Sequence, residues 1–153
     1  MAYGTHEARQ ELLGAIARAI DEIAVALAAL GAAYEQLDER TADRLEEELF
    51  RPVQVAYGRL KRTHAAFAQR HGLPARKFAP AAAPGLPSQG VRGFLDRAQE
   101  AVEAADGILS ELQDSMRPVE VGDPQLRAGL ADVRALLGDL AVRARELVRV
   151  LGR

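Results

Sequence analysis

Apolar residues recur in alternating steps of three and four along four separate stretches of the chain. Such steps place the residues on one face of an α-helix, which turns once in about 3.6 residues. The first stretch predicts a helix over residues 5–37, with Thr5 as its N-cap. Its large apolar residues are Leu13, Ile16, Ile20, Ile23, Leu27, Leu30, Tyr34 and Leu37. The charged sequence after Leu37 predicts a turn.

The second stretch predicts a helix over residues 41–71 that ends before Gly72. Pro52 lies inside this helix. A proline in a helix interior has no N–H to donate, and its ring clashes with the carbonyl four residues earlier, here that of Glu48. We therefore expect a kink near Arg51.

Two more helices are predicted over residues 89–116 and 124–152. Asp123 followed by Pro124 is typical of a helix start, as N-cap and first helical residue. Residues 73–90, LPARKFAPAAAPGLPSQG, contain four of the seven prolines and no periodic pattern, which predicts one long connection. Four helices of similar length predict a single all-α domain over residues 1–153, an antiparallel up-down-up-down four-helix bundle.

The amino-acid composition excludes several kinds of functional site. The chain has 153 residues, of which 48% are hydrophobic, and no cysteine. Disulfides, cysteine-ligated metals and thiol catalysis are therefore excluded. The apolar faces of the four helices, which we call seams, give a core that needs no cofactor or metal. The N-terminal residues lack the pattern of a secretory signal, so we expect a cytoplasmic protein.

Residues 23–34, IAVALAALGAAY, carry no charge, although a surface helix ordinarily has a polar face. The run is too short to span a membrane. One interpretation is that alanine is simply the best helix former and exposes little area. The other is a contact face at Ala24, Val25, Ala28 and Ala32, where small side chains let a second copy of the chain approach as a homodimer.

Acidic and basic residues are segregated along the sequence. No Asp or Glu occurs from Leu49 through Leu95, and lysine occurs only at Lys61 and Lys77. In the up-down-up-down order this basic region would gather at one pole of a charge-polarised bundle, with the arginines of the C-terminal helix. These charges either complement helix dipoles or bind an anion or nucleic acid. The candidate anion-binding residues are Arg59, Lys61, Arg62, Arg70, Arg76 and Lys77.

The histidines of the second helix fall on a stripe beside its apolar seam. Phe50, Tyr57, His64 and His71 are spaced by seven residues. Two helical turns, about 10 Å, separate the two histidines too far for one metal ion. A site combining His71 with His6, Glu7 and Glu11 of the first helix is a further alternative, but interfacial or capping roles are favoured.

Arg59 and His64 resemble the Arg-x4–6-His signature of HEPN-type ribonucleases, which are helical bundles that act as dimers. The resemblance implies phosphate binding by Arg59 and participation of His64 in the reaction. It covers these two residues, and Leu60 stands where that family usually has a polar residue. Catalysis requires an exposed His64, whereas its place beside the apolar seam predicts partial burial.

The sequence therefore predicts a non-enzymatic helical-bundle protein that acts by interaction or assembly, with itself or with another protein. Binding of an anion or a nucleic acid at the basic pole is the alternative. A HEPN-like ribonuclease built on Arg59 and His64 is the third hypothesis.

Overall fold

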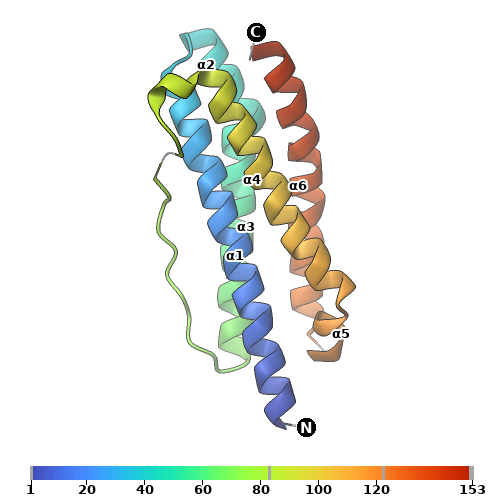
Figure 1. Cartoon of the computed structure of the whole chain (residues 1–153). Helices are drawn as coiled ribbons and strands as arrows, with labels where there is room; N and C mark the ends of the chain where they lie inside the picture. Colours follow the sequence, from blue (N-terminus) through green and yellow to red (C-terminus); the bar gives the residue numbers. More distant parts are fainter. Residues whose placement is uncertain (1, 83, 122, 152–153) are drawn as a thin grey trace.

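The computed structural model describes residues 2–82, 84–121 and 123–151. All regular elements in these ranges are helical, which confirms the predicted all-α fold (Figure 1). In chain order they are α1 (Ala2–Glu35), α2 (Glu39–Leu45), the π-helical turn η1 (Glu46–Phe50), α3 (Arg51–Arg70), the 3₁₀ turn η2 (Pro87–Gln89), α4 (Gly90–Asp114), α5 (Arg117–Val121) and α6 (Pro124–Leu151). The second predicted helix corresponds to α2, η1 and α3 together.

Local sequence sets two helix ends where they were predicted. α3 ends in a Schellman motif, in which the N–H of Leu73 donates to the carbonyl of Ala68 at 2.8 Å and Gly72 has a φ of +65°. At the start of α6, the carboxylate of Asp123 accepts a hydrogen bond from the N–H of Leu126 at 2.9 Å.

Other boundaries differ from the prediction. α1 begins at Ala2, before Thr5, and α2 begins at Glu39 because Asp38 is its N-cap and accepts from the N–H of Thr41 at 2.9 Å. The predicted break between the third and fourth helices contains the short helix α5. Residue 152, the predicted end of the fourth helix, lies outside the described residues.

A π-helical turn precedes the proline where a kink was expected. In η1 the N–H of Arg51 donates to the carbonyl of Glu46, five residues earlier. Such a wide turn within a helix is a known cause of helix bending. Pro52 has no N–H for the carbonyl of Glu48, and this oxygen instead accepts from Nη1 of Arg143 in α6 at 3.4 Å.

The helices are not connected in the expected up-down-up-down order. The packed neighbours are α1 with α4, α4 with α6, α6 with α3, and α3 with α1. Residues 71–82 and 84–86, which we call the crossover, return along the length of the bundle, so α3 and α4 run in the same direction (Figure 1). The chain is therefore an up-down-down-up bundle with one long crossover connection.

Contacts along the way fix the path of the crossover. Arg76 pairs with Asp21 of α1 at 3.0 Å. Just past the end of α1, the side-chain nitrogen of Gln36 donates to the carbonyl of Pro87, the residue that follows the crossover, at 3.0 Å. At about 3.3 Å per residue, residues 71–86 can reach roughly 50 Å, whereas the 25 residues of α4 rise about 38 Å. The connection is therefore long enough to join opposite ends of the bundle.

Packing of α1 against two other helices explains why residues 23–34 carry no charge. This helix contacts both α3 and α4, and its buried face includes Ala26, Ala29 and Ala33, which have no exposed surface. Tyr34, predicted to be in the seam, is instead 40% exposed. A helix with two helical neighbours and a covering crossover buries a broader face than a single seam. None of the described helices combines the length and hydropathy needed to cross a bilayer.

Candidate functional site

A groove between α3 and α6 brings together three of the arginines predicted to bind anions. We call it the arginine groove; its cavity is about 380 Å³. It is lined by Arg59, Arg62, Thr63, Ala66, Arg70, Gln125, Gly129 and Asp132. The α3 residues are three or four positions apart and share one helix face. In the described part of the chain, Arg59 and Arg62 form no ion pair, so their guanidinium groups are available to an external anion.

The floor of the arginine groove depends on a glycine that sequence reasoning missed. A Cβ atom placed on Gly129 would lie 2.8 Å from Oγ1 and 2.9 Å from Cγ2 of Thr63. The absent side chain therefore lets α6 approach α3 closely at this level. The hydroxyl of Thr63 donates to the carbonyl of Arg59 at 3.0 Å, which turns it toward the α3 backbone.

Asp123 holds Arg70 at one end of this groove. Its carboxylate is 5% exposed and accepts from Nε of Arg70 at 3.0 Å and from Nη2 at 2.8 Å. Nε2 of His71 lies 2.8 Å from the same carboxylate. Burial raises the pKa of Asp123, but the hydrogen bonds from Leu126, His71 and Arg70 outweigh burial, and the pKa lies below the ordinary value of 3.8.

The sequence indicated Asp123 as an N-cap and gave no sign of this second role. Its partners Arg70 and His71 lie 53 and 52 positions earlier in the chain. No local pattern predicts a pairing over such a distance, because it depends on which helices become neighbours.

The other three predicted anion-binding residues lie elsewhere. The ammonium group of Lys61 lies 4.2 Å from the centroid of the Tyr57 ring, on the side of α3 that faces α1. Arg76 is paired with Asp21, and Lys77 is exposed on the crossover. The six residues therefore do not form one site.

The expected single basic pole was also wrong. Arg143, near the end of α6, reaches the carbonyl of Glu48 near the start of the second long helix. Arg70 lies at the opposite end of the bundle, beside Asp123. Because the crossover reverses the direction of α4 and α6 relative to the expected order, basic residues occur at both ends among the acidic ones.

The burial predicted for His64 is confirmed. Its side chain is buried, and its ring packs edge to face against Phe78 of the crossover. Burial lowers the pKa of His64 below 6.5, and the positive charge of Arg76 adds to this effect. Arg59 instead lines the arginine groove, so Arg59 and His64 do not converge on one cleft.

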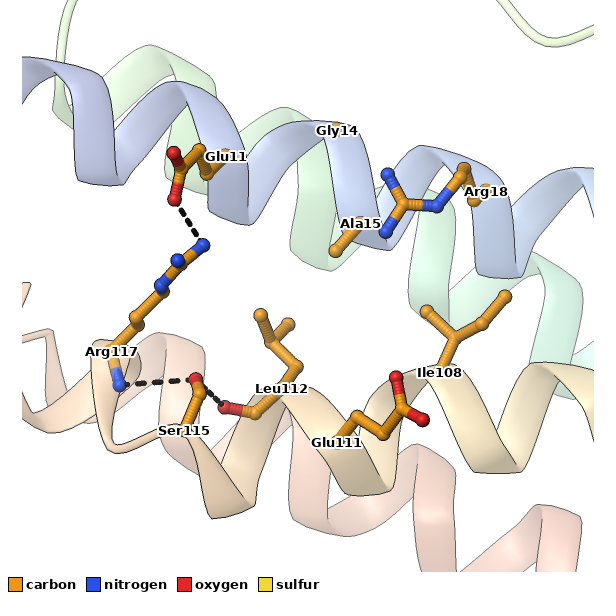
Figure 2. Close-up of a pocket in the computed structure, with 9 residues that line it drawn as sticks. All are labelled: Glu11, Gly14, Ala15, Arg18, Ile108, Glu111, Leu112, Ser115 and Arg117. Atoms are coloured by element: carbon orange, nitrogen blue, oxygen red, sulfur yellow. Dashed lines mark hydrogen bonds and ion pairs between the residues drawn. The ribbon is translucent and has the colours of Figure 1, made fainter.

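Two of the four residues proposed for a metal site have other partners. His71 contacts Asp123, and Glu11 pairs with Arg117 of α5 (Figure 2). Within residues 2–82, 84–121 and 123–151, no group of three or more His, Asp or Glu side chains is arranged to hold a metal ion.

A cavity of about 320 Å³ lies between α1 and α4 (Figure 2). Its charged lining residues are Glu11 and Arg18 of α1, Glu111 of α4 and Arg117 of α5. Figure 2 shows Arg117 extending toward Glu11 across this space. Two acidic and two basic side chains balance, so this cavity favours neither sign of ligand charge.

The predicted dimer face lies partly under the crossover. Ala24 and Ala28 line a cavity of about 470 Å³ whose lining also includes Pro80 and Ala81 of the crossover. We call this cavity the apolar groove. Val25 and Ala32 are half-buried and pack against the core. The crossover therefore flanks the face that we expected to bind a second copy.

Comparisons with protein-family models, with curated proteins and with solved structures found no match to this chain. Evidence for function therefore comes from the side chains themselves.

Proposed function

We propose that this protein is a non-enzymatic binding protein that holds a phosphate-bearing polyanion in the arginine groove. The observation that carries the proposal is the pair Arg59 and Arg62. Both line the groove without a carboxylate partner in the described part of the chain. Arg70 lies in the same groove and is already oriented by Asp123.

The chemistry of arginine supports phosphate as the ligand group. A guanidinium group is planar and presents a fork of N–H donors that matches two oxygens of a phosphate. From Arg59 to Arg70, α3 rises about 16 Å, which is long enough to contact more than one phosphate of a chain. Asp132 on the α6 wall repels an anion, so the phosphates are expected to follow the α3 wall.

Two observations disfavour the other functions that the sequence suggested. His64 is 3% exposed, and a buried imidazole cannot reach the proton of a scissile phosphodiester. Pro80 and Ala81 of the crossover line the same cavity as Ala24 and Ala28, so the crossover narrows access to that face, which argues against a homodimer through it.

Fluorescence anisotropy with labelled single-stranded RNA, duplex DNA and polyphosphate, each at several salt concentrations, tests the proposal. The test variant is Arg59→Glu with Arg62→Glu. The control is Arg145→Glu with Arg149→Glu, which makes the same change in net charge at exposed positions of α6 outside the groove.

We expect the parent protein to bind with an affinity that falls steeply with salt. For a single strand, losing two phosphate contacts should reduce the salt slope by about 1.4, at about 0.7 per contact. The control should keep most of the affinity. No binding of any of the three polyanions at about 50 mM salt, or an equal loss in both variants, contradicts the proposal. Comparison of the three ligands shows whether base contacts add to the phosphate contacts.

A further inference from the structure

We propose that the apolar groove binds a small amphipathic carboxylate, such as a medium-chain alkanoate. Its carboxylate lies at Lys61 and its apolar chain extends along α1 past Phe50. This site is independent of the arginine groove, because the two are lined by different residues of α3.

The shape of the groove follows from the small residues of α1. Ala24 and Ala28, with Leu27, form one wall; Phe50 and Tyr57 contribute to the opposite one. The crossover adds Pro80 and Ala81. Because alanine side chains do not fill the space between two helices, a cavity of about 470 Å³ remains. This volume is within the range of about 300–1,000 Å³ found for small-molecule sites.

A second cavity lies farther along α1. It measures about 390 Å³ and is lined by Gly31, Tyr34, Glu35, Glu46 and Phe50. Phe50 lines both cavities, so the two lie next to each other on either side of this residue. From Ala24 to Glu35 helix α1 rises about 16 Å. This elongated shape suits an extended chain better than a compact ring.

Charge distinguishes the two ends of the groove. Lys61 lies at one end, over the Tyr57 ring, and has no carboxylate partner in the described ranges. Glu35 and Glu46 lie at the other end, and only Glu46 has a basic neighbour there, Arg51 at 3.8 Å. A carboxylate is attracted to the first end and repelled by the second, so the charges orient the ligand.

Tyr57 supplies a second polar group beside Lys61. Burial raises the pKa of its phenol, and the nearby charge of Asp21 raises it further. The hydroxyl therefore stays protonated at neutral pH and can donate to a carboxylate. Asp21 is itself paired with Arg76 at 3.0 Å, which offsets the repulsion of a bound anion.

A single negative charge fits this site better than a phosphate. Lys61 is the one basic residue among the residues lining the 470 Å³ cavity, which otherwise offers few polar groups. A dianionic head would leave charge uncompensated next to apolar side chains, which is costly. An apolar chain, by contrast, gains from covering the exposed alanine and aromatic surface.

Isothermal titration with dodecanoate below its micellar concentration tests this site, with amide NMR signals to locate the ligand. The chain offers a matched control, since Lys61 and Lys77 are its two lysines and only Lys61 lines the groove. The variants are Lys61→Met, which keeps the apolar stem, and Lys77→Met. Ala28→Phe fills the groove, and dodecyltrimethylammonium replaces the negative head by a positive one.

We expect one dodecanoate to bind and to shift the amide signals of residues 24–31 and 54–61. Affinity should fall about tenfold in Lys61→Met, the loss of one hydrogen bond from a charged donor, and stay unchanged in Lys77→Met. Ala28→Phe should abolish binding in a protein that remains folded by circular dichroism. No binding of dodecanoate, equal binding of the cationic amphiphile, or equal affinity of the two lysine variants overturns the proposal. Adsorption only to anionic vesicles, without binding of the free acid, also overturns it.

Discussion

The ring of His64 in α3 meets the ring of Phe78 in the crossover edge to face, with 5.1 Å between the centroids and 89° between the planes. This contact joins the connection between two diagonal helices to the buried face of α3. It also covers the histidine, which is 3% exposed. The crossover is thus a packed part of the fold, and it keeps His64 largely out of contact with solvent.

Burial of His64 predicts a pH-dependent stability. Burial and the charge of Arg76 lower the pKa of the folded imidazole below 6.5. The unfolded chain therefore binds more protons than the folded one as the pH falls below about 6.5. The free energy of unfolding should decrease between about pH 7 and pH 5, and urea unfolding of His64→Phe should show a smaller decrease.

Phe78→Ala provides the control for this effect. Removal of the covering ring should expose His64, bring its pKa closer to 6.5 and make the pH dependence weaker. NMR titration of the imidazole measures this directly. An imidazole that titrates at about 6.5 in the parent protein is incompatible with the buried arrangement.

Substitution of Asp123 should separate its two roles. Asp123→Asn can still cap α6 but loses the negative charge that faces Arg70. We expect the free energy of unfolding to fall by about 2 to 3 kcal/mol, less than for a fully buried ion pair, because Arg70 is partly exposed. Asp123→Ala should lose about 1 kcal/mol more, the usual contribution of an N-cap. Chemical denaturation of the three proteins measures both steps.

The charge contribution of Asp123 has a definite pH range. Its folded pKa lies below 3.8, so the stabilisation is present above the unfolded value, about 3.9, and is lost as the pH falls through the folded value. The difference between the parent protein and Asp123→Asn should therefore shrink in acid. A constant difference down to about pH 2 would contradict the ion pair.

Gly129→Ala should destabilise the bundle by about 1 to 3 kcal/mol through overpacking against Thr63. The double variant Gly129→Ala with Thr63→Ala should recover part of this loss, because the close atoms belong to the threonine hydroxyl and methyl groups. Gly138→Ala is the matched control in α6: no atom lies within 4 Å of its added Cβ, and it should stabilise the helix by up to about 1 kcal/mol. Thermal unfolding of all three variants tests the contact.

Solution mass tests whether the crossover replaces a second copy of the chain on α1. Light scattering should give a mass of 16.5 kDa at micromolar concentration. Ala28→Arg should then leave the mass unchanged, because the new side chain enters the cavity that Ala28 shares with Pro80 and Ala81 instead of breaking an interface. A parent mass of twice 16.5 kDa that Ala28→Arg halves would instead support the homodimer.

The sequence alone determined the helices and several of their ends. Periodicity is a local property, since residues three and four apart share a helix face whatever the rest of the chain does. The same is true of the Asp123 N-cap and of the helix end at Gly72, whose hydrogen bonds join residues a few positions apart. The burial of His64 was also predictable, because it lies beside an apolar seam.

Only the tertiary structure decided which helices are neighbours. The length of residues 71–86 permits a return to either end of the bundle, and the choice depends on contacts such as Phe78 with His64 and Arg76 with Asp21. That choice joined Arg70 to Asp123 and placed Arg76 beside Asp21, away from the arginine groove. It also brought Pro80 and Ala81 of the crossover to the cavity that Ala24 and Ala28 line. Burial and ion pairing between distant segments depend on the whole packed chain, and so no local pattern encodes them.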